Sequence, residues 1–302
     1  MTGPFTIAHF TDPHLPLLAD EVRLFAAGLN KRLSGVLSWR LKRRRIHLPE
    51  ILAALVSDIH AHRPDHIVLT GDLLNISLPE EFTRAKAWLG ELGAPTDVSL
   101  VPGNHDAYMA ADCDAGQSQW AAYMQGDDLN AGIHFPYCRV RGGIAFIGVS
   151  TAVPTQLFDA TGAVGAGQRD ELGKLLERLG QEQMLRIVMM HHPPGPSGAS
   201  KRKGLTDLIP LRQVFARHGA ELVLHGHTHR GVFEHIAGPH GSIPVLAPSS
   251  ASALDPHREN ARWHLLEVSR AASGNWQAQI TVRGYIPASR QFGTEGQFSL
   301  LL

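Results

Sequence analysis

Polar side chains that can hold a metal ion follow a series of short apolar runs in the sequence. The segment HGHTHR, from His225 to Arg230, places three histidines within five residues directly after the apolar run AELVL. The motifs TDPH, TGDLLN, PGNHD and MMHHPP end other runs and contribute Asp12, His14, Asp72, Asn75, Asn104, His105, Asp106 and His191. Carboxylate, amide and imidazole donors without a thiolate suit Mn²⁺, Fe or Zn²⁺, and they disfavour a calcium cage or a four-cysteine zinc site.

The apolar runs predict the strands that would bring these motifs together. They are short, rich in β-branched residues or leucine, and bounded by Gly, Pro or Asp: Phe5–Thr11, His66–Gly71, Asp97–Gly103, Ile144–Ser150, Leu185–His191 and Ala220–Gly226. Between them, apolar residues at three- and four-residue spacing predict helices over Leu48–His62, Pro79–Leu92, Gln168–Gln181 and Asp207–His218. Because open α/β sheets bind ligands at the carboxyl ends of their strands, we expect the motifs to converge on one site.

The last third of the chain shows strand patterns without intervening helices. These are the stretches GVFEHI, SIPVLA, ARWHLLEV and WQAQITVRGYI. With the alternating strands and helices that precede them, they predict an α/β fold with a strand-rich C-terminal third. The sequence shows no internal repeat and no low-complexity linker, so we expect residues 1–302 to form a single domain.

Composition restricts the partners and the compartment. Lys and Arg total 28, as do Asp and Glu, so the molecule has no net charge that would attract nucleic acid or membrane. The two cysteines, Cys113 and Cys138, cannot form a disulfide framework. The N-terminus lacks the pattern of a signal peptide, and no apolar run reaches the ~18 residues of a membrane span. We therefore expect a cytoplasmic protein, which a local basic patch could place at the membrane periphery.

Five motifs in a fixed order carry a family resemblance. DPH, GDLLN, GNHD, HHPP and GHTH resemble the signature of the calcineurin-like metallophosphoesterases, over roughly Phe5 to Arg230. GNHD, HHPP and GHTH together are most similar to the branch of class III cyclic nucleotide and glycerophosphodiester phosphodiesterases. The resemblance implies a two-layer βαβαβ metallophosphoesterase sandwich, in which helices cover two mixed sheets.

The resemblance also implies a pair of metal ions, which could be Mn, Fe or Zn. The first metal would be held by Asp12, His14, Asp72 and His229, and the second by Asp72, Asn104, His191 and His227. A carboxylate that bridges, here Asp72, can hold two cations ~3.5–4 Å apart, and the pair lowers the pKa of a bridging water towards neutrality. Hydrolysis would then proceed by attack of the metal-bridging hydroxide on phosphorus.

Three further residues are expected beside the metals. The resemblance directs His105 at the substrate, where an imidazolium can stabilise charge on the phosphoryl group or protonate the leaving oxygen. Asp106 is expected, from adjacency alone, to orient His105. Asn75 stands three residues after Asp72 in the GDxxN form, whose amide can hold a phosphate oxygen, and a turn or helix cap is the alternative.

The other histidines near the motifs are expected to be ordinary core or surface residues. This applies to His9, His66, His192 and His225. We choose His191 over His192 as the ligand because the ligand in similar proteins directly follows the strand. Aspartate and asparagine also stabilise turns without any metal, but this explanation would have to hold independently at five motifs. In HGHTHR we expect His227 and His229 to reach different metals, with Thr228 pointing away between them.

A basic insertion at about residues 29–47 departs from the family pattern. From Lys31 to Arg45 the chain has seven basic residues and no acidic one. Apolar residues at helical spacing predict a helix over Leu29 to Arg45, and they include Leu29, Leu33, Val36, Leu37 and Leu41. This helix could be a solvated cap, a basic lid over an anionic substrate, or a contact with anionic lipid or a membrane surface. Nucleic-acid binding ranks lower because the tract has a single aromatic residue, Trp39.

The motifs favour a binuclear metal-dependent phosphodiesterase that acts on a small phosphorylated substrate. The basic tract motivates an alternative, the hydrolysis of lipid-linked phosphoesters or pyrophosphates as in UDP-diacylglucosamine pyrophosphohydrolases. A nuclease ranks below both. A protein-binding scaffold that has lost its metals is disfavoured because the ligand set is intact. The sequence leaves the oligomeric state open.

Overall fold

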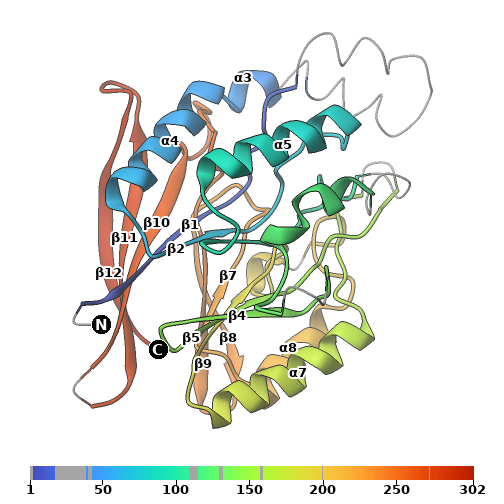
Figure 1. Cartoon of the computed structure of the whole chain (residues 1–302), viewed down its shortest axis with the longest axis vertical. Helices are drawn as coiled ribbons and strands as arrows, with labels where there is room; N and C mark the ends of the chain where they lie inside the picture. Colours follow the sequence, from blue (N-terminus) through green and yellow to red (C-terminus); the bar gives the residue numbers. More distant parts are fainter. Residues whose placement is uncertain are drawn as a thin grey trace.

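Two mixed sheets face each other, and helices cover their outer sides (Figure 1). The structure is a computed structural model, and it describes residues 3–17, 39, 43–108, 115–128, 132–156, 159–198, 200–271 and 273–302. Helices α4 (Pro49–His62) and α5 (Pro79–Leu92) lie on one side of the molecule. Helices α7 (Ala166–Gln181) and α8 (Leu208–His218) lie on the other side.

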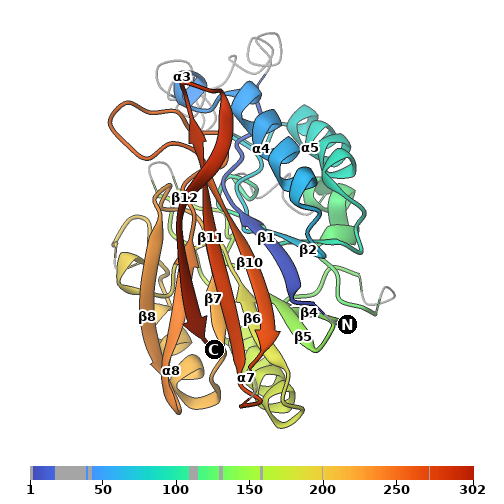
Figure 2. The same cartoon turned by 90° about the vertical axis from the view of Figure 1, so that its left-hand side faces the viewer.

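The first sheet joins strands from both ends of the chain. Its order is β12 (Gln291–Leu301), β11 (Trp276–Ile286), β10 (Arg262–Arg270), β1 (Phe5–Phe10), β2 (His66–Leu69) and β3 (Val98–Leu100). β1, β2 and β3 are parallel, whereas β10, β11 and β12 add to β1 as an antiparallel series. Figure 2 shows these long C-terminal strands beside β1.

The second sheet is parallel in its centre and antiparallel at both edges. Its order is β4 (Tyr137–Arg141), β5 (Ile144–Gly148), β6 (Leu185–Met189), β7 (Leu222–Leu224), β9 (Gly241–Ala247) and β8 (Val232–Gly238). The ladders from β5 to β9 are parallel, and β4 and β8 pair antiparallel with their neighbours. These two sheets confirm the predicted α/β fold, including the strand-rich C-terminal third, but β4 and β12 were not predicted.

The four predicted helices are confirmed, and each begins within two residues of its expected start. α4 and α5 begin with Pro49 and Pro79, at the first helical position, where a missing N–H costs no helical hydrogen bond. Arg63 ends α4 in a left-handed conformation. The described residues also include the three-residue helix α3 (Arg44–Ile46) and the 3₁₀ turns Ser118–Tyr123 and Pro196–Gly198.

Side chains that alternate along β5 fill the two hydrophobic cores. Ile144 and Phe146 belong to the core that includes residues of both sheets. Ala145 and Ile147 face the opposite way, into the core shared with α7 and α8. This alternation is the ordinary consequence of strand geometry, and it buries both faces of the central strands. Polar groups therefore collect where the strands end.

Most of the basic insertion lies outside the described residues. This includes most of the helix predicted over Leu29–Arg45 and most of Lys31–Arg45, on which the lipid or membrane contact depends. The described part comprises Trp39 and Arg43–Arg45. Trp39 is buried against Leu17, Ile76 and Leu78, so this part of the insertion packs on the core. Among the described helices, none has the length and apolar character needed to cross a bilayer.

Candidate active site

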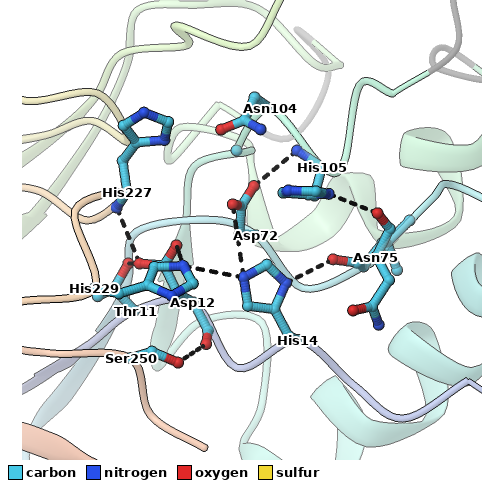
Figure 3. Close-up of polar contacts among 12 residues, drawn as sticks. Thr11, Asp12, His14, Asp72, Asn75, Asn104, His105, His227, His229 and Ser250 are labelled. Atoms are coloured by element: carbon cyan, nitrogen blue, oxygen red, sulfur yellow. Dashed lines mark hydrogen bonds and ion pairs between the residues drawn. The ribbon is translucent and has the colours of Figure 1, made fainter. Parts of the chain in front are cut away.

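The sequence motifs meet at the carboxyl ends of five strands, in both sheets. Asp12 follows β1, Asp72 follows β2 and Asn104 follows β3. From the second sheet, His191 follows β6, and His227 follows β7. Figure 3 shows the side chains of Asp12, His14, Asp72 and His229 close together. The expected convergence of the motifs is therefore what the fold produces.

Two groups of side chains with suitable donors share one carboxylate. In the first group, ligand atoms of Asp12, His14, Asp72 and His229 all lie within 4.8 Å of one another. In the second group, ligand atoms of Asp72, His191 and His227 do the same. Asn104 adjoins the second group, because its Oδ1 lies 3.2 Å from Nε2 of His191. Six of the seven residues expected as ligands thus lie in these two groups and Asn104 lies beside the second, while their binding of metal ions stays a prediction.

Asp72 lies between the two groups. Its Oδ2 is 3.9 Å from Nε2 of His14 and 3.4 Å from Nε2 of His191. Its Oδ1 accepts a hydrogen bond of 2.8 Å from the backbone N–H of His105. The residue is only 2% exposed, so water contributes little to the solvation of this charge. One oxygen of Asp72 is therefore available to both groups.

Nitrogen atoms that face each other show that the residues suit bound cations. Nε2 of His14 lies 3.2 Å from Nε2 of His229, and Nε2 of His191 lies 3.2 Å from Nδ1 of His227. Two imidazole lone pairs repel at this distance unless a proton or a metal ion lies between them. Buried imidazoles and carboxylates that point into a common space are the donor set expected for Mn, Fe or Zn.

Hydrogen bonds to the far side of the rings direct these nitrogens. Nδ1 of His14 lies 3.0 Å from the carbonyl oxygen of Leu74, and Nδ1 of His191 lies 2.7 Å from that of Thr70. Because a carbonyl can only accept, each Nδ1 carries a proton. Nε2 is then the nitrogen that faces the site and can bind a metal ion. This is the usual outer arrangement around histidine ligands.

His192 is held differently from its neighbour His191. Its Nδ1 lies 2.8 Å from Oγ1 of Thr151, and its Nε2 lies 3.1 Å from the carbonyl oxygen of Ala160. Both nitrogens therefore have partners within the protein. These contacts favour the choice of His191 rather than His192 as the ligand.

Strained backbone supports most of the expected ligands. Five of them have positive φ, with values of 51° for Asp12, 42° for His14, 57° for Asp72, 72° for His227 and 53° for His229. Such conformations cost roughly 1–3 kcal/mol each in non-glycine residues, and they concentrate at functional sites. Gly103 permits one of the turns, because a Cβ there would overlap the carboxylate of Asp72. The fold thus gives up stability to hold these side chains together.

Burial and neighbouring charges set the protonation of the cluster. Burial alone would raise the pKa of Asp72, but His191 and His105 outweigh it and hold this pKa well below its ordinary value. Burial lowers the pKa of His14 to about 4. For His191, burial acts downward, but the charge of Asp72 and a hydrogen bond to it raise the pKa to about 9. The carboxylates are therefore ionised, and the metal-free cluster takes up positive charge at His191.

Asp106 supports the backbone around Asp72. Its Oδ2 accepts hydrogen bonds from the backbone N–H groups of Asp72 (2.9 Å) and Gly103 (2.8 Å), and its Oδ1 accepts one from Leu74 (3.0 Å). Burial, with the nearby charge of Asp72, raises the pKa of Asp106 to about 7. These bonds go to backbone amides and not to the His105 ring, so the expected orienting role of Asp106 is not what the structure shows. Instead, Nδ1 of His105 lies 2.5 Å from the carbonyl oxygen of Asn75.

The side chain of Asn75 joins two loops that are distant in the sequence. Its Nδ2 donates a 2.7 Å hydrogen bond to the carbonyl oxygen of Leu15, and the residue is only 1% exposed. Its backbone N–H donates to Oε1 of Glu81 at 2.7 Å, and Oε2 of Glu81 accepts from Leu78 at 2.9 Å. These contacts favour a structural role for Asn75 over the phosphate contact, which stays a prediction.

A pocket of about 270 Å³ opens over the cluster, and part of its lining was not anticipated. Thr228, which we expected to point away, contributes to the lining. His47 forms a further group with His14 and His229, and its Nδ1 lies 2.9 Å from Oγ of Ser252. The insertion also contributes Arg43. Neither His47 nor Arg43 belongs to a motif, so their only signal was their position in the insertion.

Comparisons with known proteins agree with this geometry. Residues 5–231 match the family model described as calcineurin-like phosphoesterase. A probable cyclic nucleotide phosphodiesterase of Synechococcus sp. is 28% identical over 231 residues, which are 76% of this chain and 80% of that protein. The glycerophosphodiester phosphodiesterase GpdQ of Enterobacter lignolyticus is 43% identical over 56 residues, which are 18% of this chain and 19% of that protein.

A solved structure shares the fold along nearly the whole chain. The crystal structure of a dimetal phosphatase from Danio rerio has a TM-score of 0.63 and 14% identity, and the match covers 97% of this chain and 98% of that one. The motifs, the shared fold and the family match all lead to one assignment, and they confirm a metal-dependent hydrolase of phosphoric esters. The chain belongs to the calcineurin-like phosphoesterase family.

Proposed function

We propose that this protein is a phosphodiesterase with two metal ions. The observation that carries the proposal is the position of Asp72, which belongs to both groups of potential ligands. The first metal would be held by Asp12, His14, Asp72 and His229, and the second by Asp72, Asn104, His191 and His227. Two cations bound there would activate a water molecule and withdraw charge from the phosphoryl group.

His105 would act on the substrate and not on the metals. It lines the pocket, and its Nδ1 faces the carbonyl oxygen of Asn75 at 2.5 Å. This contact fixes the ring and leaves Nε2 as the nitrogen that can exchange a proton with a ligand in the pocket. Burial and the charge of Arg43 hold the pKa of His105 well below its ordinary value, so Nε2 would need the negative charge of a bound substrate to take up a proton. Transfer of that proton to the leaving oxygen would be general acid catalysis.

A small phosphodiester is the substrate class that the pocket and the relatives favour. The pocket volume of about 270 Å³ suits a small molecule more than a polymer. The Synechococcus relative is named as a probable cyclic nucleotide phosphodiesterase, and GpdQ as a glycerophosphodiester phosphodiesterase. Hydrolysis of lipid-linked pyrophosphates depends on the basic tract from Lys31 to Arg45, most of which lies outside the described residues, so it stays a prediction.

Hydrolysis assays with the metal-loaded protein test the proposal. Protein incubated with Mn²⁺, and in parallel with Fe²⁺ or Zn²⁺, would be assayed on bis(p-nitrophenyl) phosphate and p-nitrophenyl phosphate, then on cyclic nucleotides and glycerophosphodiesters. We expect turnover of the diester to exceed that of the monoester and to disappear after chelation. A preference for the monoester would contradict the diesterase assignment, and no turnover with any metal would contradict the enzymatic role.

A further inference from the structure

Arg43 is a cation in the active-site pocket that the motifs do not explain. It directly precedes α3, and it lines the pocket together with Asp72, Asn104 and His105. Its guanidinium faces the His105 ring, with Nη2 at 2.9 Å from Nε2 and Nη1 at 3.2 Å from Nδ1. The basic insertion therefore places the guanidinium of Arg43 in the pocket that the expected metals would share.

Among the described residues, Asp72 is the carboxylate with the largest favourable effect on the charge of Arg43, but it does not form an ion pair with it. Within the described ranges of the chain, no carboxylate forms an ion pair with this guanidinium. Arg258, another cation of the pocket wall, differs because its Nε lies 4.0 Å from Oδ2 of Asp255. The side chain of Arg43 is half-buried, and this burial lowers its pKa. A half-buried cation with no carboxylate in direct contact among the described residues is costly, and a bound anion would reduce that cost.

The contact with His105 cannot satisfy the guanidinium. Because Nδ1 of His105 faces the Asn75 carbonyl at 2.5 Å, this nitrogen carries the proton and cannot accept from Arg43. Only Nε2 can accept, so His105 takes one hydrogen bond from the five N–H groups of an arginine. Among the described residues, the remaining donors of the fork have no partner, so they can bind a ligand with several oxygens, as arginine binds phosphate.

Contacts on both sides fix the place of Arg43. On the N-terminal side, Trp39 of the insertion is buried against Leu17, Ile76 and Leu78. On the C-terminal side, the backbone N–H of His47 donates to the carbonyl oxygen of Arg43 at 2.8 Å, and His47 pairs with Ala253 as an isolated β-bridge. The side chain therefore projects into the pocket from supported backbone.

We propose that Arg43 binds a non-bridging oxygen of the substrate phosphoryl group, which makes part of the basic insertion a substrate-binding element. The substrate's phosphate would take the free donors of Arg43 and release Nε2 of His105 to face the leaving group. The inference rests on the proposed phosphoesterase site, but the insertion that supplies Arg43 lies outside the sequence motifs that predict that site.

Substitutions on one short segment test the role of Arg43. Arg43→Gln removes the charge, Arg43→Lys keeps the charge but removes the planar fork, and Arg44→Gln removes an exposed arginine one residue away. For each Mn²⁺-loaded protein, the measurements are metal content, thermal unfolding, calorimetric binding of inorganic phosphate, and kcat and KM for bis(p-nitrophenyl) phosphate.

We expect Arg43→Gln to weaken phosphate binding and raise KM by about 10-fold or more at unchanged metal content, since a charge-assisted contact is lost. The phosphate affinity and KM of Arg43→Lys should lie between those of Arg43→Gln and the wild type. This variant also tests the inference if Arg43→Gln does not fold. Arg44→Gln should match the wild type. Unchanged phosphate affinity in both Arg43 variants would overturn the inference, as would a fall in kcat alone. Phosphate binding tests Arg43 even if the wild type hydrolyses no ester, and that result would contradict the proposed function instead.

Discussion

Two groups of histidines in this protein have opposite surroundings. The site histidines, defined here as His14, His191, His227 and His229, lie in loops after the strands. The core histidines are His9, His66, His225 and His264, of which His9, His66 and His264 lie within strands β1, β2 and β10. All four core histidines are at most 4% exposed, and so are His14 and His191, whereas His227 and His229 are half-buried, so burial does not set the site histidines apart as a group.

Carboxylates are what separate the groups. Every site histidine belongs to a group that includes Asp72, and one of these groups also includes Asp12. His9 and His264 instead approach each other, with ring centroids 6.0 Å apart, and burial lowers the pKa of His264 to about 4. None of the described clusters that could hold a metal includes a core histidine. A buried imidazole among apolar groups remains neutral, whereas one beside ionised carboxylates can share a cation with them.

The largest expected effect follows from removing the charge that the two metal sites share. Asp72→Asn keeps the shape of the side chain but removes the negative charge that offsets two cations. We expect the loss of at least one metal ion per chain and a fall in turnover of about 10³-fold or more. Elemental analysis and diester hydrolysis would measure both. His264→Gln is the control from the core, and its metal content should equal that of the wild type.

Adjacent histidines offer a closer comparison. His191→Ala should lower the affinity of the second metal by at least about 100-fold, because it removes a ligand outright. His192→Ala should leave the metal content unchanged, since both nitrogens of this residue already have partners within the protein. Calorimetric titration with Mn²⁺ would compare the two variants. If His192→Ala lost the metal instead, the assignment of these two residues would have to be reversed.

A change at His105 should affect the reaction and spare the metals. His105→Ala removes the proton donor but none of the expected ligands, so we expect full metal content with kcat about 10²-fold lower. Elemental analysis and diester kinetics on the same preparation would separate the two effects. Metal loss in this variant would show that His105 is a ligand and not an acid.

The smallest effect concerns a core histidine and the pH dependence of stability. Burial lowers the pKa of His66 from 6.5 to about 3, and its Nε2 lies 2.8 Å from Oγ of Ser99. The unfolded chain takes up a proton at His66 below about pH 6.5 while the folded protein does not. Its contribution therefore lowers the free energy of unfolding, by up to about 1.4 kcal/mol per pH unit, as the pH falls from 6.5 towards 3.

His66→Gln should remove this dependence. Glutamine does not titrate and can still form a hydrogen bond with Ser99. Urea unfolding between pH 4.5 and 7.5 should show a smaller loss of stability on acidification in His66→Gln than in the wild type. His240→Gln, a change at an exposed histidine, serves as the control and should not alter the slope. Equal slopes for His66→Gln and the wild type would contradict the prediction.

The sequence predicted the strands and loops that depend on short-range patterns of residues. The central strands are continuous apolar runs, and a parallel arrangement places their polar ends at one edge, so the convergence of Asp12, Asp72 and His191 followed from short-range information. Strand β4 was missed because its pattern is atypical. Arg139, in the middle of β4, is buried and donates hydrogen bonds to the carbonyl oxygens of Gln125, Pro95, Val98 and Ala122. No local pattern predicts these partners.

The contacts around the site also depend on distant parts of the chain. Asp106 was expected to orient the neighbouring His105, but its carboxylate reaches the amides of Asp72 and Leu74 in a different loop. His47 and Arg43 reach the pocket because the segment before α4 packs beside residues such as Ser252, more than two hundred positions along the chain. Adjacency in sequence was a poor guide to contact in these cases.

The most direct test of the account is the metal content of the wild-type protein. Purified protein would be stripped with a chelator, saturated with Mn²⁺, passed through a desalting column, and analysed for manganese against protein concentration. The protein is expected to bind two manganese ions per chain, because the two ligand groups share Asp72. One ion per chain, or none, at saturating Mn²⁺ would contradict the binuclear centre.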